Sequence, residues 1–576
     1  MKKAVLILIL LTCFITYLIF LPYSNKLHTN LPNAVDPVFY AWNINHNTQS
    51  VLQKGRGMLD TNIFYPEGNT LSFSDTLYGQ TIFTMPIQLL TNNVVLTENL
   101  YIFITFPLAA ISMFFLSYFL TKHLLASFLS GIFFAFAYPR LAQIGHMPMI
   151  SSQWIPLFVL YLIKYMEHGS WKHLLLTFLF YLLSIASSIY FGIFLIPFVI
   201  FTIVLESIRL IKEKSIKTLK RILRSLAIFF IPMMGVLILV LYPYIRLKIE
   251  YPQIKRSLED SARFSAQLVD YKTVLPTSWL ATYNMFPTNI NERPLYLTAT
   301  LTILAIFGMI VGWKKYKKYV ALLSLTGISA WILSFGPYLD IIIGKFEWFH
   351  VTMPYYYLYQ FIPLMQTIRV PSRFSIIVVL AFSALAAIGL SHILKRRFKF
   401  LLAGLIILLF MIEVWQIQTP SVPIPLQKDI PVVYQWLSKQ SDSSIIVEIP
   451  FRPFSSIITS MEDQLFQQYS EIKENEVYAL EAYRTYFSSY HRKRMLNGYS
   501  GFFPQIYHDQ AMTLQHFPSK ESISMLEKQH VRYVIVHAWQ YTDTYMIDVK
   551  REASKFQHIQ LVQQFGEDYV YEIIKK

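Results

Sequence analysis

The chain has 576 residues, of which 54% are hydrophobic and only 15% charged, and its formal net charge is +16. Soluble domains carry about 25% charged residues, so this composition excludes an ordinary soluble protein and indicates a multi-pass membrane protein. The positive charge does not indicate nucleic-acid binding, because most Lys and Arg residues lie in short connections between long uncharged runs. The only cysteine, Cys13, lies inside the first of these runs, so the sequence offers no disulfide framework and no cysteine-based metal site.

Apolar runs that are long enough to cross a bilayer as helices need about 20 residues. We place about eleven of them, near residues 4–22, 99–121, 124–139, 152–166, 172–189, 191–210, 222–243, 295–313, 318–337, 374–393 and 399–416. The first run follows Lys2 and Lys3 as in a signal peptide, but it is long and no small-x-small cleavage site follows it, so we expect an uncleaved span. Residues 79–94 are apolar but contain Pro86 and an Asn-Asn pair, which predicts a re-entrant or interfacial segment.

The basic residues alternate with these runs as the positive-inside rule requires. Lys and Arg gather in the connections at residues 1–3, 122–123, 167–173, 209–224, 313–318 and 394–399. We therefore expect the N-terminus and these connections in the cytoplasm. The outer side then holds the first loop at residues 23–98, the later loops at 140–151, 244–294 and 338–373, and the C-terminal part.

The composition changes after residue 416, which predicts a membrane domain at residues 1–416 and an extracytoplasmic domain at residues 417–576. A Pro-rich linker, IQTPSVPIPLQKDIP, opens the second part. Helices are predicted for PVVYQWLSKQ, for SKESISMLEKQ with Ser519 as its cap, and for TDTYMIDVKREASKFQ. Strands are predicted for SSIIVEIPF and VRYVIVH, and a hairpin turning near Gly566 for IQLVQQFGEDYVYEI. This alternation predicts a small mixed α/β domain.

The stretch LPNAVDPVFYAWNINH, residues 31–46, follows the first span and contains one acid, Asp36. A lone carboxylate just outside the membrane is a candidate general base. Asp-Pro is also a common helix opening, so Asp36 could begin a helix and still point its carboxylate at a substrate. Asp75 lies on the same predicted side. It could share base or metal-binding roles with Asp36, or it could cap the segment that follows it.

Basic residues on the predicted outer side are candidates for substrate binding. Arg140 offers a forked donor suited to phosphate, and its alternative role is to snorkel at the interface. His146 could bind phosphate or a sugar hydroxyl, or it could be an interfacial histidine with satisfied hydrogen bonds. Arg369 and Arg373 bracket a Val-Pro-Ser turn directly before a span and break the positive-inside pattern. Two guanidinium groups at that place suit a lipid phosphate.

Six stretches together resemble a bacterial branch of the GT-C integral membrane glycosyltransferases. They are DPVFYAWNINH, NIFYPEGNTLSFSDTLYGQ, AFAYPRLAQIGHMPMISSQWIPL and TIRVPSRF, and, in the C-terminal part, HRKRMLNGYSGFFPQIY and FPSKESISMLEKQHVRYVIVH. The resemblance implies a GT-C-like helical membrane fold with an extracytoplasmic domain. It also implies a sugar donor carried on polyprenyl phosphate and an acceptor that is a cell-envelope glycan, lipid or protein.

The same resemblance implies a role for Asp36 as the base that deprotonates an acceptor hydroxyl, with inversion at the anomeric carbon. Many members of the family have an acid pair in this loop, whereas here Pro37 follows Asp36. That departure leaves the metal requirement open. A divalent metal, Mg or Mn, is a candidate cofactor, and Asp36 and Asp75 would be its ligands if one is used.

The alternative function is that of a non-catalytic membrane protein, either a transporter for envelope glycans or a scaffold for envelope assembly. A transporter is expected to carry ionisable groups in mid-membrane. The sequence has few of these, with Glu413 near the outer end of its run and Glu206 near the inner end of its own. A scaffold requires no special chemistry.

Overall fold

The computed structural model describes residues 1–53, 57–252, 255–283, 285–289, 292–343, 347–394, 397–451, 474–540 and 543–574. A helix occupies each predicted apolar run: α1 (Lys2–Ile19), α4 (Val94–Thr121), α5 (Leu124–Phe136), α8 (Ile155–His168), α9 (Trp171–Ser187), α10 (Ile189–Phe194) with α11 (Ile196–Lys212), α12 (Ile216–Glu250), α14 (Ala299–Lys315), α15 (Lys317–Ser334), α17 (Ser375–Ile393) and α18 (Lys399–Val414). Within the described ranges, six helical stretches are long and apolar enough to cross a membrane. The prediction of a helical membrane protein is confirmed, whereas the number of about eleven spans stays a prediction.

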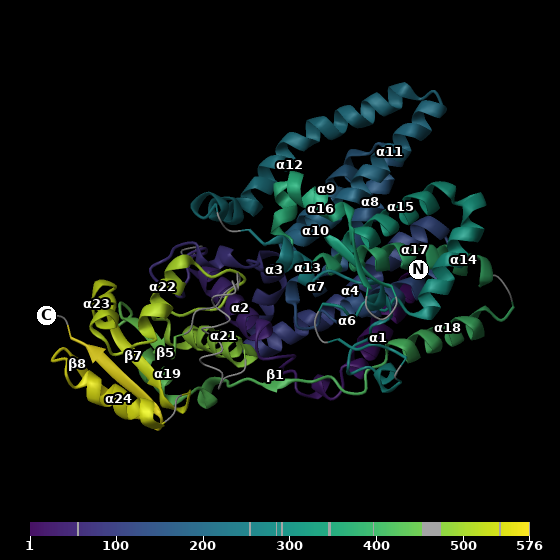
Figure 1. Ribbon diagram of the computed structural model, residues 1–576. Helices are drawn as coiled ribbons and strands as arrows, with labels where there is room; N and C mark the ends of the chain where they lie inside the picture. The colour runs from purple at the N-terminus through teal and green to yellow at the C-terminus, as the bar shows by residue number, and fades with distance from the viewer. Residues whose placement is uncertain are drawn as a thin grey trace.

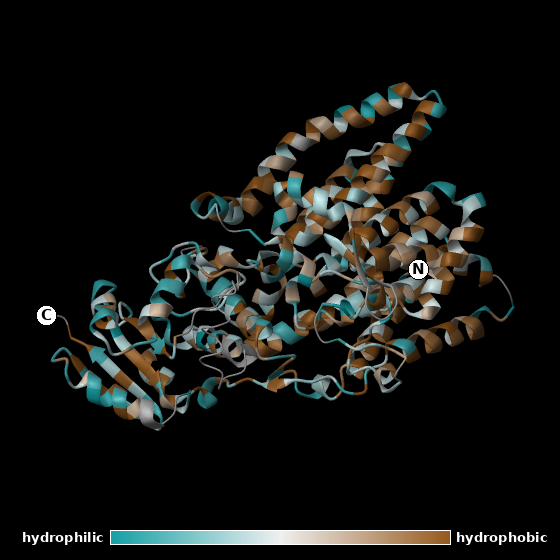
Figure 2. Cartoon of the chain, in the orientation of Figure 1, coloured by the Kyte–Doolittle hydropathy of each residue, from teal (hydrophilic) through white to brown (hydrophobic). Residues whose placement is uncertain are grey.

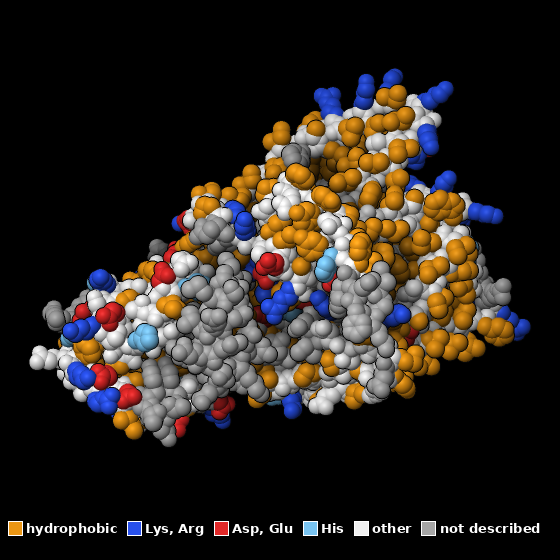
Figure 3. All heavy atoms as spheres, in the orientation of Figure 1, with side chains coloured by type: hydrophobic (Ala, Val, Ile, Leu, Met, Phe, Trp, Pro, Cys, Tyr) orange, Lys and Arg blue, Asp and Glu red, His pale blue; other side chains and the backbone are white. Residues whose placement is uncertain are grey.

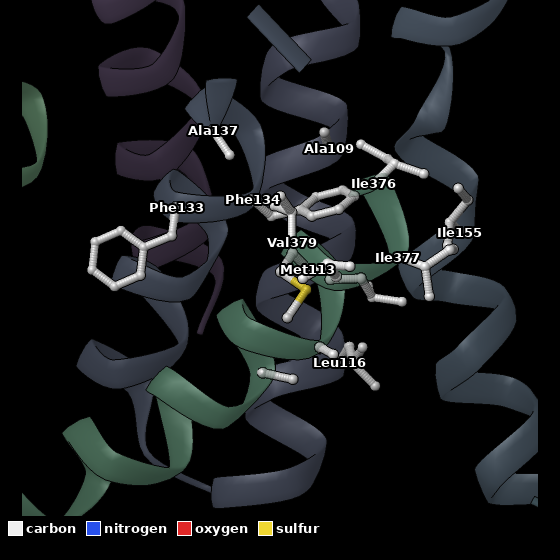
Figure 4. Packing of buried hydrophobic residues seen from close by; sticks show 14 of the residues in the cluster. Ala109, Met113, Leu116, Phe133, Phe134, Ala137, Ile155, Ile376, Ile377 and Val379 are labelled. Carbon is white, nitrogen blue, oxygen red and sulfur yellow. The ribbon is translucent and has the colours of Figure 1, made fainter. Parts of the chain in front are cut away.

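Helix α17 lies at the centre of the helical body and packs against α14, α15, α5 and α4. Its apolar run is 94% buried. Small residues let two of these backbones approach closely, since Gly308 of α14 lies against Leu385 and Gly389 of α17. Figure 4 shows apolar side chains from α4, α5 and α17 filling the space between the helices, among them Met113, Phe134 and Val379.

Helices α11 and α12 form a hairpin that projects from this body (Figure 1). Only 6% of the apolar run of α12 is buried in the protein. The sides of the hairpin are apolar and its far end is basic (Figures 2 and 3). Exposed lysines there are Lys212 at the end of α11, Lys214 in the connection, and Lys217 and Lys220 at the start of α12. An uncharged surface of this length suits lipid tails, which would cover it in a membrane.

The charged connections sort to two ends of the helical body. At one end the Lys318 ammonium pairs with Glu167 at 3.1 Å and with Glu206 at 2.8 Å, and Glu206 also pairs with Arg209. These residues lie in or beside three connections that were predicted to share the inner side. Loops predicted to share the outer side meet at the candidate site described below. The basic residues Lys395 and Arg396 lie outside the described residues.

The first loop is largely structured, with η1 (Tyr23–Asn25), β1 (Asn30–Leu31), α2 (Asp36–Leu52), η2 (Thr70–Phe73) and α3 (Tyr78–Thr91). Helix α3 covers the segment predicted to be re-entrant or interfacial. It has 14 residues and contains Pro86. A helix of that length reaches about 21 Å, which is short of the roughly 30 Å hydrocarbon core. It packs on α2, α4 and α9 instead.

The other loops at this end carry only short elements. They are α6 (Tyr138–Leu141), α7 (Met147–Ile150), η3 (Ser152–Trp154), α13 (Leu258–Arg263), η4 (Leu268–Lys272), η5 (Trp279–Thr282), β2 (Tyr338–Ile343), β3 (Glu347–Thr352), α16 (Pro354–Phe361), η6 (Pro363–Thr367) and η7 (Pro371–Phe374). Strands β2 and β3 form an antiparallel pair.

The C-terminal part is a mixed α/β unit, as predicted. It contains β4 (Val422–Pro423), η8 (Gln427–Asp429), α19 (Val432–Ser438), β5 (Ile445–Ile449), α21 (Glu474–His491), β6 (Arg494–Met495), α22 (Gln505–Leu514), α23 (Lys520–Lys528), β7 (Val531–His537), η9 (Ala538–Gln540), α24 (Asp543–Ala553), β8 (Ile559–Phe565) and β9 (Asp568–Ile573). The five-stranded sheet has the order β6-β5-β7-β9-β8. Strand β5 is parallel to β6 and β7, and β9 is antiparallel to β7 and β8.

The predicted elements of this unit are confirmed in type and place. The Ser519 hydroxyl accepts the N–H of Ser522 at 3.2 Å and so caps α23. Gly566 has a positive φ of 60°, as the tight turn between β8 and β9 requires.

The hydrophobic core of this unit is continuous with the first loop. Backbone hydrogen bonds join the two, because the Met495 N–H donates to the Asn62 carbonyl at 2.8 Å and the Tyr65 N–H donates to the Met495 carbonyl at 2.9 Å. Strand β1 also pairs antiparallel with β4, which fixes the predicted linker. One apolar cluster therefore contains side chains of α2 and of the sheet. The domain boundary at residues 416 and 417 stays a prediction.

Replacing Gly308 should weaken the packing of α14 on α17. A Cβ atom at this position would lie 1.9 Å from the Leu385 carbonyl oxygen. Two backbones would have to separate, and overpacking of this kind costs about 1–3 kcal/mol. We expect Gly308→Ala to lower the melting temperature in detergent. Gly404→Ala is the matched control, because nothing lies within 4 Å of its added Cβ; equal melting temperatures for the two variants would contradict the packing.

Candidate active site

Asp36 is the first residue of α2, and Pro37 follows it. The first turn of a helix has free N–H groups and favours negative charge, and proline costs no hydrogen bond there. The Asp-Pro pair therefore opens a helix, as one interpretation of the sequence predicted. The Asp36 side chain nevertheless stays 31% exposed, so its carboxylate remains accessible to a substrate.

Two side chains from distant segments hold the Asp36 carboxylate. The Tyr499 hydroxyl donates to its Oδ1 at 2.7 Å, and Nε2 of His146 lies 3.2 Å from its Oδ2. Glycine at position 145 allows the loop before His146 to approach, because a Cβ atom there would lie 2.5 Å from the Asn33 side-chain nitrogen. Both carboxylate oxygens therefore have a fixed partner.

His146 connects Asp36 to a second acid. Its Nδ1 lies 3.8 Å from a carboxylate oxygen of Glu292. Glu292 makes a two-pronged ion pair with Arg373, in which the Arg373 Nε donates at 3.1 Å, and it accepts the Gln143 amide at 2.8 Å. The Arg373 guanidinium also lies over the Tyr190 ring, 5.4 Å from its centre. Tyr499, Asp36, His146, Glu292 and Arg373 thus come from five segments that were all predicted to lie on the outer side.

The environment of Asp36 keeps it ionised. Burial alone would raise the pKa of this carboxyl, but the hydrogen bonds from His146 and Tyr499 and the charge of Arg373 outweigh burial and lower it below the ordinary value. For Glu292, burial is opposed by Arg373, His146 and Gln143, and its pKa falls to about 2. Both acids are therefore negatively charged at neutral pH.

Asp75 is in a different environment. Burial raises the pKa of its carboxyl to about 6, although the charge of Arg373 and a hydrogen bond from the Ile189 N–H oppose this. That hydrogen bond joins Asp75 to the start of α10. The alternative role as a cap of the following segment is wrong, because α3 begins after Leu77 and has no side-chain cap. The charges of both Asp36 and Asp75 act on Tyr40 and contribute to raising the pKa of its hydroxyl.

Arg140 is completely enclosed, with 0% of its surface exposed. Its guanidinium donates to the Ser152 hydroxyl and to the carbonyls of Ala135 and Ile150, each at 2.9 Å. These contacts tie together the loop that carries His146. The side chain does not face a space that a substrate could enter in this structure.

Arg369 is the more open of the two arginines before α17, with 41% of its side chain exposed. Its guanidinium stacks on the Phe264 ring at 4.6 Å, and its nearest acid, Asp260, lies 3.9 Å away. A third arginine, Arg256, shares Asp260 at 3.9 Å and stacks on Phe502 at 3.9 Å. Basic charge therefore accumulates beside the Glu292–Arg373 pair.

A small cavity adjoins that ion pair. Its polar lining consists of Gln143, Glu292, Ser372, Arg373 and Ser375, and the rest is apolar. As for a metal ion, no three His, Cys, Asp or Glu side chains in the described part of the chain converge closely enough to hold one. Mg²⁺ is commonly held by one or two carboxylates together with waters, so Asp36 and Asp75 stay the candidate ligands predicted from the sequence, and no step below passes through a metal.

Sequence reasoning identified Asp36, His146 and Arg373, and the structure brings these three together. It did not identify Glu292 or Tyr499. Glu292 had one available signal, since it is an acid directly before a predicted span on the outer side. Tyr499 lies in the stretch HRKRMLNGYSGFFPQIY but is one of 38 tyrosines, and nothing local distinguishes it.

Glu292→Gln should destabilise the protein, because Arg373 would lose its charge partner. The two side chains are only 8% and 14% exposed. Breaking a buried ion pair by removing one partner costs about 3–5 kcal/mol. A marked fall in melting temperature in detergent checks this prediction. Glu552→Gln, which removes an exposed pair with Lys555, should leave the melting temperature unchanged.

The contribution of the Glu292–Arg373 pair to stability should depend on pH in a defined direction. The pKa of Glu292 is about 2 in the folded protein and about 4.3 in an unfolded chain. The carboxylate therefore contributes fully above the unfolded value, and its contribution is lost as the pH falls through the folded one. The melting-temperature difference between wild type and Glu292→Gln should accordingly be constant from pH 7 to about pH 5 and shrink below it; a difference independent of pH down to 3 would contradict this.

Solved structures of membrane glycosyltransferases share this architecture. Arabinofuranosyltransferase AftD from Mycobacteria matches with a TM-score of 0.57 at 12% identity, over 100% of this chain and 40% of that one. An oligosaccharyltransferase from Archaeoglobus fulgidus matches with a TM-score of 0.50 at 11% identity, over 98% of this chain and 73% of that one. No family model and no curated protein sequence matches the chain. The chain spans less than half of the mycobacterial protein, and it has the fold of the GT-C glycosyltransferases.

Proposed function

We propose that this protein is a membrane glycosyltransferase that moves a sugar from a polyprenyl-phosphate donor to a hydroxyl group of a cell-envelope glycan, lipid or protein. The observation that carries the proposal is the convergence of an accessible, ionised Asp36 with basic side chains from separate loops, in a chain with the GT-C fold. Solved proteins with this fold are described as an arabinofuranosyltransferase and an oligosaccharyltransferase, which supports sugar transfer as the reaction class.

In the proposed reaction Asp36 is the general base. It accepts the proton of the acceptor hydroxyl while that oxygen attacks the anomeric carbon from the face opposite the phosphate. The bond between the anomeric carbon and the phosphate oxygen breaks, and polyprenyl phosphate leaves with the electron pair, so the configuration inverts. The lowered pKa of Asp36 ensures that it is ionised beforehand, and its exposed face lets the proton pass to water afterwards.

We assign the donor phosphate to Arg369 first. Its guanidinium is exposed and its nearest acid lies 3.9 Å away, so it has donors to offer. The charge of Arg373 is already compensated by Glu292, and we assign Arg373 to the electrostatic field around Asp36 and to the wall of the cavity. His146 orients Asp36, and Arg140 holds the loop that carries His146.

The proposed enzyme is a multi-pass protein of the cell membrane, with its N-terminus in the cytoplasm and its C-terminal domain outside. The positive-inside pattern supports this orientation, since the basic tip of the α11–α12 hairpin lies at the end assigned to the cytoplasm. The substrate lipid would then approach from the surrounding bilayer.

The two acids that the sequence analysis considered for a transporter, Glu413 and Glu206, do not favour that function. The Glu413 carboxylate accepts the N–H groups of Ala299 and Thr300 at 2.8 and 3.1 Å, and so caps α14. Glu206 is paired with Arg209 and Lys318. Both groups have structural partners, whereas a carrier for ions or protons needs a group that can exchange them.

Asp36→Asn should abolish sugar transfer while the amount of folded protein stays normal. An amide accepts no proton at this position, and general base catalysis contributes about 10²–10⁴-fold to a rate. The assay incubates purified protein with a panel of polyprenyl-phosphate sugars and measures donor consumption. Asp429→Asn, at an exposed site in η8, is the control and should be fully active. Full activity of Asp36→Asn would refute the assignment of the base.

Arg369→Gln should raise the KM for the lipid-linked donor. A charge-assisted hydrogen bond contributes about 1.5–3 kcal/mol, so we expect a rise of at least about tenfold with a smaller change in kcat. Arg263→Gln is the matched control, because Arg263 also lies over the Phe264 ring, at 5.7 Å, but belongs to the exposed end of α13. Equal donor KM values for both variants would remove Arg369 from the donor site.

A further inference from the structure

The C-terminal domain reaches the candidate active site through the loop that follows β6. This loop places Tyr499 beside Asp36, 463 residues away in the chain, with its hydroxyl donating to Asp36 Oδ1 at 2.7 Å. The contact joins a soluble-type domain to a residue at the mouth of the helical body. A side chain that donates a hydrogen bond to one carboxylate oxygen occupies one lone pair of that oxygen. It therefore determines which lone pairs of the carboxylate remain free to accept a proton.

The loop is fixed on both sides of Tyr499. Before it, the Asn497 side chain makes two hydrogen bonds to the backbone of Glu448 in β5, at 2.7 and 3.0 Å. After it, the Gly501 carbonyl accepts from Arg256 at 2.6 Å, and the Phe502 N–H donates to the Phe73 carbonyl at 3.0 Å. The backbone of the loop is therefore set by the sheet on one side and by two outer loops on the other.

Tyr499 itself is held by contacts that do not involve its hydroxyl. Its N–H donates to the buried hydroxyl of Thr485 in α21 at 2.9 Å. Its ring packs edge-to-face against Phe39 of α2 at 5.6 Å and against Phe503 at 6.3 Å. Removing only the hydroxyl should therefore leave the ring in place.

We propose that Tyr499 is a positioning residue for the base, so that the C-terminal domain completes the active site of the membrane domain. This inference rests on the proposed function of Asp36. The phenol holds Oδ1 while His146 holds Oδ2, which fixes the plane of the carboxylate. Each oxygen keeps one further lone pair, and the one on the exposed side accepts the proton of the acceptor hydroxyl. When the carboxylate is held in one orientation, it does not have to be ordered when the acceptor binds, and this lowers the entropic cost of reaching the transition state.

Several charged or titratable groups face Asp36, and the phenol is one of them. The others are His146 from the second outer loop, Arg373 from η7, Glu98 from α4, and Tyr40 from α2, which also feels Asp75. A hydrogen bond donated to the ionised carboxylate lowers the pKa of Asp36. Loss of this one donor should therefore raise the pKa of Asp36 while the other groups stay in place.

Tyr499→Phe tests the proposal through two measurements. The first is steady-state kinetics, in which we expect kcat to fall about tenfold while KM for the acceptor stays within about twofold, because orientation matters in the transition state. The second is labelling of Asp36 by a hydrophobic carbodiimide, which reacts with the protonated carboxyl group, over a pH series with peptide mass spectrometry. The labelling midpoint should rise by about one pH unit, as expected for loss of one charge-assisted hydrogen bond.

Tyr490→Phe is the matched control. Its hydroxyl makes a comparable bond, 2.9 Å to the hydroxyl of Tyr486, on the same helix as Thr485 and away from Asp36. We expect wild-type kcat and a wild-type labelling midpoint for this variant. Equal changes in Tyr490→Phe and Tyr499→Phe would mean a general effect on the C-terminal domain and would overturn the proposal.

The outcomes separate this inference from the proposed function. Activity that depends on Asp36, with wild-type kcat and midpoint in Tyr499→Phe, overturns the inference alone. Absence of transfer activity in the wild type overturns the proposed function and the catalytic part of the inference. The shift of the labelling midpoint in Tyr499→Phe then still decides whether the phenol holds Asp36. If Tyr499→Phe yields no folded protein while Tyr490→Phe folds, the hydroxyl of Tyr499 has a structural role that the proposal excludes, and the proposal is overturned.

Discussion

The arrangement of this protein depends on keeping one carboxylate charged and accessible where helices and loops meet. An isolated ionised acid is costly to enclose, and the protein offsets the cost with a chain of alternating partners. Asp36 is held by His146, His146 lies against Glu292, and Glu292 is bound by Arg373. Arg373 compensates the charge of Glu292, and His146 lies between the two acids. Because every member comes from a different loop, the chain of contacts also fixes how the loops pack on one another.

The two acids of the first loop, Asp36 and Asp75, have different pKa values because their surroundings differ. Asp36 has donors on both oxygens and a pKa below the ordinary value, whereas burial raises the pKa of Asp75 to about 6. The lowered pKa keeps the Asp36 carboxylate ionised at neutral pH, so it is unprotonated when an acceptor arrives. Asp75 instead accepts a hydrogen bond from the Ile189 N–H at the start of α10, directly before Tyr190, whose ring lies under Arg373. The two environments therefore distinguish Asp36, the proposed base, from Asp75, whose carboxylate contacts the segment that lines the site.

Much of the fold could be predicted from sequence because its causes are local. Apolar runs predict helices wherever water is absent, and the alternation of Lys and Arg predicts which loops share a side. The C-terminal strands and the turn at Gly566 follow from equally local patterns. The site was predictable only in part. Asp36, His146 and Arg373 stand out as polar residues beside apolar runs, whereas the role of Tyr499 depends on a contact across 463 residues that no local pattern encodes. Arg140 was predicted as a phosphate ligand because of its residue type, but its buried guanidinium donates its hydrogen bonds within the protein.

The first loop and the C-terminal sheet share one hydrophobic core, so the change in composition after residue 416 does not mark the edge of a separate core. A change in composition records a change of surroundings, from lipid to water, and not by itself a unit that folds alone. Residues 62–65 pair with β6 at the edge of the sheet, and Phe39 of α2 packs on Tyr499. An exposed strand edge would otherwise lack hydrogen-bond partners, and the first loop supplies them. The same pairing that completes the sheet places Tyr499 beside Asp36, so the stability of the C-terminal part and the orientation of the Asp36 carboxylate depend on one set of contacts.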